Sequence, residues 1–235
     1  MMKLICFDLD DTLWDFKSCL LRAEQALHSW LADQYPDFAG QHDMTSLRER
    51  RRRLLEERSE LRHDIGRVRW LAMKHAAEAS GYSDTDSRRL AHAAFKNFMV
   101  HRNNVELFDD VMPALQTLRQ QYKLCSLTNG NADLNQIGMA DLFHHNLSAE
   151  AVGAAKPSAK MFHEACRLTN VHPSEAVHIG DDPDHDVMAA RDAGMKSIWI
   201  NRKQTAWPHA ARADGEIQSL AELVTWLQQN SPVAV

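Results

Sequence analysis

The stretch Leu4–Phe16, which reads LICFDLDDTLWDF, places three aspartates directly after a short apolar run. The apolar run predicts a buried strand over Lys3–Phe7. Asp8, Asp10 and Asp11 follow within four residues, where their carboxylates repel one another. This repulsion indicates that the loop after the strand holds a cation.

Strand-like and helix-like patterns alternate in the second half of the chain. Apolar runs occur at Lys123–Thr128, Ala176–Gly180 and Lys196–Ile200, and amphipathic helical segments separate them. Such alternation is typical of a parallel sheet whose two faces are covered by helices. We therefore expect an α/β fold with a doubly wound, Rossmann-like parallel sheet.

The segment between the first strand and this alternating region carries helical periodicity and no buried-strand pattern. Its most charged part, residues 46–64, predicts one long helix. The gap between the first two strands is about 120 residues, which is far longer than an ordinary crossover connection and should hold a subdomain. We expect an α/β core of residues 1–14 and 104–235 and an inserted helical cap of residues 15–103.

Composition and charge argue against several classes of protein. A formal net charge of -5 argues against nucleic-acid binding, and no apolar run reaches the roughly 18 residues of a membrane span. The first residues do not resemble a signal peptide, and the cysteines lie far apart without a CxxC pair. We therefore expect a cytoplasmic protein with reduced, buried thiols, whose oligomeric state is not predicted. The four cysteines are Cys6, Cys19, Cys125 and Cys166.

Four polar clusters are expected at or just beyond the carboxyl ends of strands, where ligands bind in open α/β sheets. They are Asp8-Leu9-Asp10, Thr128-Asn129-Gly130, Lys156-Pro157 and Gly180-Asp181-Asp182. Oxygen-only ligands favour Mg²⁺ over zinc, and Mg²⁺ is commonly bound together with phosphate. The Thr128 hydroxyl and the amides around Asn129 can donate to phosphate oxygens, and Lys156 adds a positive charge. The clusters therefore predict a magnesium ion and a phosphoryl group.

The order and spacing of these clusters resemble the haloacid dehalogenase superfamily of phosphohydrolases, in the branch with a helical cap after the first motif. The segments DLDDT, SLTNG, KP at Lys156 and GDDPDHD resemble its four motifs, in order and over nearly the whole chain. The resemblance implies that Asp8 is the nucleophile that becomes an aspartyl-phosphate. It implies that Asp10 is the general acid and base, and that Lys156 screens the charge between Asp8 and phosphate.

The resemblance also implies which residues hold phosphate and metal. The phosphoryl oxygens would be held by the second cluster, which consists of Thr128, Asn129 and Gly130. The Mg²⁺ ligands would be Asp8, Asp181 and the backbone carbonyl of Asp10. Asp186 would lie in or next to the shell of groups behind the metal ligands. Asp182 is predicted equally well to lie there or to act as the N-cap of the following helix.

The leading functional hypothesis is a Mg²⁺-dependent phosphatase of a small phosphorylated metabolite. The whole sequence looks most like bacterial phosphatases that act on FMN or on 5-amino-6-(5-phosphoribitylamino)uracil. Nucleotidases and sugar-phosphate phosphatases of the same family are alternatives. A metal-free 2-haloacid dehalogenase is the second enzymatic hypothesis. Asp10 and the acidic fourth motif argue against it. A non-catalytic binding module is the remaining alternative, although each charged catalytic residue is present.

Two features of the predicted cap stay open. The run Arg48–Arg53 is interleaved with glutamates, and the pair Glu49 and Arg53 lies at helical spacing, which favours a solvated helix face over nucleic-acid binding. Asp64 and Arg69 lie on a cap segment and are candidates for contact with the leaving group. We expect Arg69 to affect substrate preference more than the chemical step.

Overall fold

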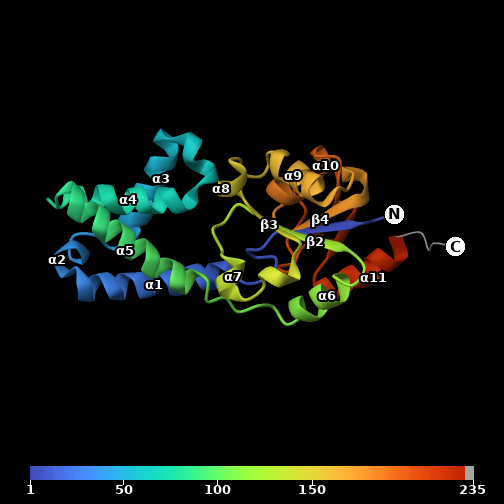
Figure 1. Cartoon of the computed structure of the whole chain (residues 1–235), viewed down its shortest axis with the longest axis horizontal. Coiled ribbons are helices and arrows are strands. Elements are labelled where there is room, and N and C mark those ends of the chain that lie inside the picture. Colours follow the sequence, from blue (N-terminus) through green and yellow to red (C-terminus); the bar gives the residue numbers. More distant parts are fainter. Residues whose placement is uncertain (231–235) are drawn as a thin grey trace. The chain divides into compact units, whose positions relative to one another are not determined.

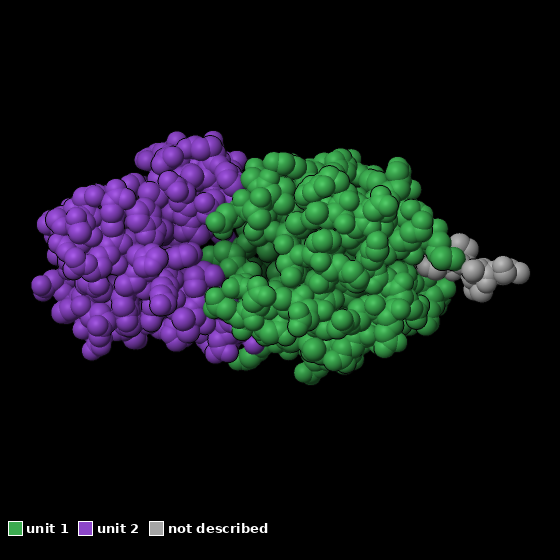
Figure 2. All heavy atoms as spheres, in the orientation of Figure 1, with its two compact units in different colours: residues 1–15, 106–235 green, residues 16–105 purple. Residues whose placement is uncertain are grey.

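The computed structural model describes residues 1–230 and divides into two compact units (Figure 2). One unit, here called the core, contains residues 1–15 and the chain from residue 106 onward. The other, here called the cap, contains residues 16–105. No helix in the described part of the chain combines the length and the apolar character that a membrane span requires.

A parallel sheet forms the centre of the core unit (Figure 1). Its strands are β1 (Leu4–Phe7), β2 (Lys123–Thr128), β3 (His145–Ser148), β4 (Ala176–Gly180), β5 (Lys196–Ile200) and β6 (Gly215–Ile217). Their order is β3-β2-β1-β4-β5-β6, and every neighbouring pair is parallel. The winding reverses at β1, which pairs with β2 on one side and with β4 on the other, so the predicted doubly wound sheet is confirmed. A ligand site is expected where this reversal leaves a crevice, at the carboxyl ends of these three strands.

Helices cover both faces of this sheet, with α9 and α10 on one face and α6 and α11 on the other (Figure 1). The core helices are α6 (Val111–Leu118), α7 (Leu134–Ile137), α8 (Ala149–Val152), α9 (Lys160–Thr169), α10 (Ala189–Asp192) and α11 (Leu220–Asn230), with short helical turns η2 (Ala140–Leu142), η3 (Pro173–Glu175) and η4 (Pro183–Met188). Because β1 is covered on both faces, all four of its residues are buried, which explains its unbroken apolar run. All four cysteines of the chain are buried free thiols, as expected.

The cap unit is helical throughout. It contains α1 (Phe16–Gln34), α2 (Pro36–Ala39), α3 (Met44–Glu57), η1 (Ser59–His63), α4 (Ile65–Ala79) and α5 (Asp84–Arg102). The single long helix expected over residues 46–64 is wrong, since α3 ends at Glu57 and Arg58 leaves the helical region with φ -130°. The chain must turn there because α4 packs back against α3. The turn also buries Leu61 among leucines of both helices.

Candidate active site

Three carboxylates meet at the carboxyl ends of β1 and β4. One oxygen from each of Asp8, Asp181 and Asp186 lies within 4.8 Å of the others. The backbone N–H of Asp8 donates to the carbonyl of Ile179, 2.9 Å away, which extends the pairing of β1 with β4 and holds Asp8 beside the other two. Oxygen ligands at this spacing suit a single hard cation such as Mg²⁺.

The electrostatics of this carboxylate cluster also fit a cation. Burial raises the pKa of Asp8 well above its usual range, although the Lys156 ammonium opposes the shift. Burial, followed by the repulsion of Asp186 and Asp11, raises the pKa of Asp181 to about 7. These shifts mean that the ionised carboxylates lack sufficient compensating charge from the protein. A bound divalent ion would supply it and would keep the carboxylates ionised.

Lys156 joins two of these carboxylates. Its Nζ donates to Asp8 Oδ1 at 2.7 Å, to Asp186 Oδ1 at 2.5 Å and to the carbonyl of Leu127 at 2.8 Å. The residue is only 3% exposed, so burial favours its neutral form, but Asp186 and Asp8 hold its pKa above the ordinary value. Lys156 is therefore a fixed cation whose three donors are all used within the protein.

Asp186 is oriented by groups on every side. Its Oδ1 also accepts from Nε2 of His178 at 2.8 Å, and its Oδ2 accepts from the backbone N–H of Asp182 at 3.2 Å. Burial lowers the pKa of His178, so the ring is neutral and donates this hydrogen. A Cβ added to Gly180 would collide with the Asp186 carboxyl, so only glycine allows this close approach. Asp186 thus holds Lys156 in place against Asp8. The hydrogen bond from His178 to Asp186 was not predicted from the sequence.

The carboxylate of Asp10 has a different partner. Its Oδ1 accepts from Nε1 of Trp14 at 2.8 Å, and the Trp14 side chain is completely buried. The backbone N–H of Asp11 donates to the Trp14 carbonyl at 2.9 Å, which closes the loop between them. Asp11 has φ +61° and pairs with Lys203 at 3.0 Å. Trp14 was not predicted as a site residue, and its only sequence signal is its place four residues after Asp10.

The second cluster is tied to the Lys156 loop. The Asn129 side chain donates to the Lys156 carbonyl at 2.9 Å and accepts from the Lys156 N–H at 2.7 Å. The Thr128 hydroxyl accepts from the N–H of Gly130 at 2.8 Å, which leaves its own hydrogen available as a donor. The peptide bond between Lys156 and Pro157 is cis. Asn129 therefore joins the loop after β2 to the loop that carries the lysine.

Asp182 is the N-cap of η4, which is one of the two roles predicted for it. Its Oδ1 accepts from the backbone N–H groups of Asp184 at 2.9 Å and His185 at 2.8 Å, at the start of η4. It also pairs with the His185 ring at 3.1 Å. A carboxylate at this position compensates the unpaired N–H groups of the helical turn.

The two cap residues singled out from the sequence have partners inside the cap. Asp64 is the N-cap of α4 and accepts from the backbone N–H of Arg67 at 2.8 Å. Arg69 pairs with Glu24 at 3.6 Å and lies over the Phe98 ring, 3.6 Å from its centroid. Asp64 thus has a structural task of its own within this unit.

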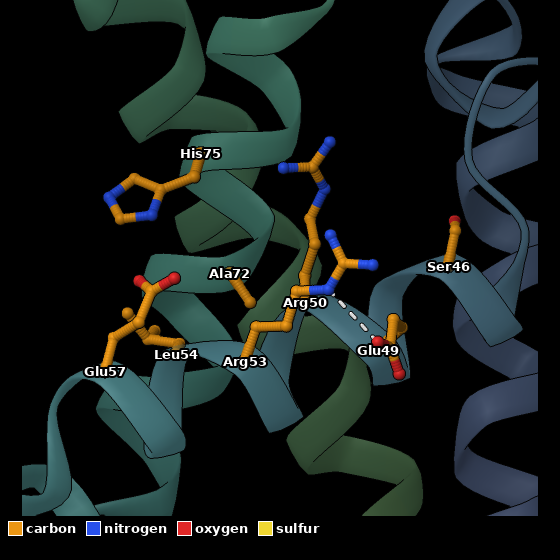
Figure 3. Close-up of a pocket in the computed structure, with 8 residues that line it drawn as sticks. All are labelled: Ser46, Glu49, Arg50, Arg53, Leu54, Glu57, Ala72 and His75. Atoms are coloured by element: carbon orange, nitrogen blue, oxygen red, sulfur yellow. Dashed lines mark hydrogen bonds and ion pairs between the residues drawn. The ribbon is translucent and has the colours of Figure 1, made fainter.

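One cavity lies beside the carboxylate cluster, and another lies within the cap. A cavity of about 120 Å³ lies against Asp181 in the core, bordered by Asp11 and by residues 199–203. A cavity of about 370 Å³ lies between α3 and α4 of the cap, where acidic and basic side chains alternate (Figure 3). Its lining residues are Ser46, Glu49, Arg50, Arg53, Leu54, Glu57, Ala72 and His75. Only the smaller cavity borders a residue of the carboxylate cluster.

Comparison with known proteins places these features in context. A sequence model described as "Hydrolase: haloacid dehalogenase-like hydrolase" matches residues 2–194. The chain is 30% identical over 230 residues to the 5-amino-6-(5-phospho-D-ribitylamino)uracil phosphatase of Escherichia coli, with 95% of each chain covered. It is 30% identical over 208 residues to a glyceraldehyde 3-phosphate phosphatase of Methanopyrus kandleri, covering 86% of this chain and 85% of that one.

Among solved structures, the chain is similar to a 2-haloacid dehalogenase from Pseudomonas syringae pv. Tomato. The two share 40% sequence identity with a TM-score of 0.94, over 98% of this chain and all of that one. Phosphatase and dehalogenase names thus both occur among the proteins that this chain matches over most of its length.

Proposed function

Since this chain belongs to the haloacid dehalogenase-like hydrolases, we propose that it is a Mg²⁺-dependent phosphatase of a small phosphorylated metabolite. Family membership confirms the resemblance drawn from the four motifs, and the phosphatases among its relatives support an enzyme of this class. The observation that carries the proposal is the placement of Asp8 at the end of β1, bonded to Lys156 and beside Asp181.

Asp8 performs the first chemical step in this proposal. Its carboxylate attacks the phosphorus atom, a new O–P bond forms, and the bond between phosphorus and the leaving oxygen breaks. Asp10 gives a proton to that leaving oxygen, and the alcohol departs. Asp10 then takes a proton from a water molecule, which attacks the aspartyl-phosphate and releases inorganic phosphate and free Asp8.

Fixed positive charge and hydrogen-bond donors stabilise the phosphoryl group during both steps. Lys156 lies against Asp8 and offsets its charge as the phosphate approaches. The Thr128 hydroxyl can donate to a phosphoryl oxygen. Because the Asn129 side chain is already bonded to the Lys156 backbone and the Gly130 N–H is bonded to the Thr128 hydroxyl, we expect the backbone N–H of Asn129 to serve here instead.

The carboxylate cluster fits the metal that the proposal requires. Asp8, Asp181 and the backbone carbonyl of Asp10 would hold Mg²⁺, while Asp186 orients Lys156 behind them. When bound, the ion neutralises negative charge on the phosphoryl oxygens and on the nucleophile.

The identity of the metabolite is a finer proposal. The Escherichia coli relative is named for a ribitylaminouracil phosphate and spans nearly the whole chain. We therefore propose this compound and FMN as the first substrates to test, with nucleotides and sugar phosphates as the alternatives.

Dehalogenation is the second candidate function, and the dehalogenase structure at 40% identity favours it. In that reaction the aspartate attacks carbon, so neither a proton donor at Asp10 nor a cation at Asp181 is required. The hydrogen bond that holds the Asp10 carboxylate against Trp14, and the crowding of Asp181 with Asp186, therefore support the phosphatase instead.

One experiment separates the two functions. Purified protein is assayed for phosphate release from p-nitrophenyl phosphate with Mg²⁺ or with EDTA, and for chloride release from 2-chloropropionate. We expect Mg²⁺-dependent phosphate release and no chloride release. Chloride release without added metal, together with inactivity on the phosphate ester, would assign the dehalogenase function.

A further inference from the structure

The cap contains three arginines that surround one buried carboxylate. Arg48 and Arg51 on α3 and Arg69 on α4 all form ion pairs with Glu24 on α1. The Glu24 side chain is 1% exposed, and the distance to it is 2.7 Å from Arg51 and 3.6 Å from Arg69. These four residues are called the arginine cluster below.

The charges of the arginine cluster do not balance. Within residues 1–230, Glu24 is the one carboxylate that pairs with these arginines, so three positive charges face one negative charge. The side chains of Arg51 and Arg69 are only 16% and 12% exposed, and burying like charges without compensation is unfavourable. Attraction to the arginines outweighs burial and lowers the pKa of Glu24, so the carboxylate is already ionised and can offer no more charge.

Arg69 has a donor that makes no hydrogen bond within the described chain. Its Nη1 is buried and makes no hydrogen bond, and the nearest Glu24 oxygen is 3.6 Å away. The Phe98 ring supports the guanidinium plane from one side. Burial and the repulsion of Arg51 lower the pKa of Arg69 to about 9, which leaves it positively charged near neutral pH.

Neighbouring arginines on α3 lack this imbalance. Arg52 pairs with Glu49 and Glu56, and Arg53 pairs with Glu49, and all of these side chains are well exposed. The cavity in Figure 3 likewise has glutamates beside its arginines. The excess of buried positive charge is therefore a local property of the arginine cluster and does not extend over the whole basic run.

We propose that the arginine cluster binds an oxyanion, a carboxylate or phosphate group, through the guanidinium groups of Arg51 and Arg69. A guanidinium offers paired N–H donors that match the two oxygens of such a group. The oxyanion has two possible sources: a second anionic group on the phosphorylated substrate, or a small free anion. The first source rests on the proposed phosphatase function, and the second does not.

Binding of a free anion is tested with malonate, by titration calorimetry on the whole protein. We expect saturable binding that Arg51→Gln and Arg69→Gln weaken by about tenfold or more. Glu24→Gln should strengthen binding, because it removes the internal competitor for the same donors. Arg53→Gln removes an exposed arginine from the same helix and should change nothing. If Arg51→Gln fails to fold, Arg51→Lys keeps the charge but loses the paired donors, and should also bind malonate less tightly.

A substrate-borne oxyanion is tested with two phosphate esters that differ at one carbon. 6-Phosphogluconate carries a carboxylate where glucitol 6-phosphate carries a hydroxymethyl group. If the substrate is the source, the wild type should prefer 6-phosphogluconate in kcat/KM by about tenfold, and Arg51→Gln should abolish the preference without affecting p-nitrophenyl phosphate. Malonate binding with equal kcat/KM values for the two esters would assign the free anion.

The outcomes of these tests separate the two proposals. Hydrolysis of p-nitrophenyl phosphate with neither malonate binding nor an arginine-dependent preference overturns the anion site and leaves the phosphatase function standing. Malonate binding that depends on Arg51, in a protein without phosphatase activity, supports the anion site and overturns the proposed function. Malonate binding that is unchanged in both glutamine variants of the arginines overturns the assignment to this cluster.

Discussion

At the scale of single residues, Trp14 is the side chain whose contribution to the chemistry can be isolated best. Its indole N–H donates to Asp10, and replacing it with phenylalanine removes the donor while keeping most of the buried aromatic volume. A hydrogen bond to a charged group contributes roughly 1.5–3 kcal/mol. We expect Trp14→Phe to lower kcat on p-nitrophenyl phosphate by about tenfold or more while KM stays nearly constant, because the role proposed for the Asp10 carboxylate is proton transfer and not phosphate binding.

The control is Trp207→Phe, which removes an indole donor from the carbonyl of Ala211. Thermal unfolding of both variants checks that the fold is intact. Equal kcat values for the two variants would show that the bond from Trp14 does not position Asp10.

The raised pKa of Asp181 predicts that Mg²⁺ binding depends on pH. A pKa of about 7 in the metal-free protein means that a proton competes with Mg²⁺ below that pH. Burial also raises the pKa of Asp8, so the competition involves at least one proton and acts in the same direction. The apparent affinity for Mg²⁺ should fall by about tenfold or more for each pH unit below 7. Calorimetric titration of Mg²⁺ over this range provides the measurement, and an affinity independent of pH would contradict the account.

At the scale of elements, β4 and η4 meet so closely that Gly180 has no room for a side chain. Gly180→Ala should push the Asp186 carboxyl away and disturb its bond to Lys156. Overpacking of this kind costs about 1–3 kcal/mol in the free energy of unfolding, and phosphatase activity should fall with it. Urea denaturation measures the first effect. The matched control is Gly40→Ala, where an added Cβ meets no atom closer than 3.4 Å, and stability should change by less than about 1 kcal/mol.

Elements differ in how well the sequence predicts them, for physical reasons. Strands β1, β2 and β4 were predictable because their apolar runs must be buried. Parallel pairing then aligns the carboxyl ends of these strands. β6 was missed because its three residues, GEI, are too few to show a pattern. The break after α3 depends on how α4 packs back, and that packing is not encoded by the periodicity of α3 itself.

The residues of the candidate site also differ in how well the sequence predicts their contacts. The four motifs indicated which side chains gather at the sheet edge, because three of them begin at the end of a strand and Lys156 lies in the loop beyond β3 and α8. The bonds from Trp14 to Asp10 and from His178 to Asp186 could not be predicted, since they depend on how a loop closes and on how near a helical turn approaches a strand. The same holds for Glu24 in the cap, which appears in the sequence as one surface glutamate among many.

At the scale of the whole molecule, the two proposed functions lie in different units. The groups proposed for the phosphoryl transfer lie in the core unit, between β1, β2 and β4 and the loops that follow them. The cap supplies the arginine cluster, which is proposed to recognise an oxyanion. Variants of the cap cluster should therefore leave hydrolysis of p-nitrophenyl phosphate intact, whereas variants of Asp8 or Lys156 should remove activity on every phosphate ester.

The central claim is that Asp8 carries the phosphoryl group during turnover, and acid quenching tests it most directly. Protein mixed rapidly with p-nitrophenyl phosphate and Mg²⁺ is quenched in acid, digested and mapped by mass spectrometry. We predict a phosphoryl group on Asp8 in the wild type and none in Asp8→Asn, which should also lose turnover while remaining folded. Asp11→Asn, which alters a half-buried carboxylate in the same loop, should still be phosphorylated on Asp8. Phosphate release without a phosphorylated Asp8, or turnover that persists in Asp8→Asn, would contradict the account.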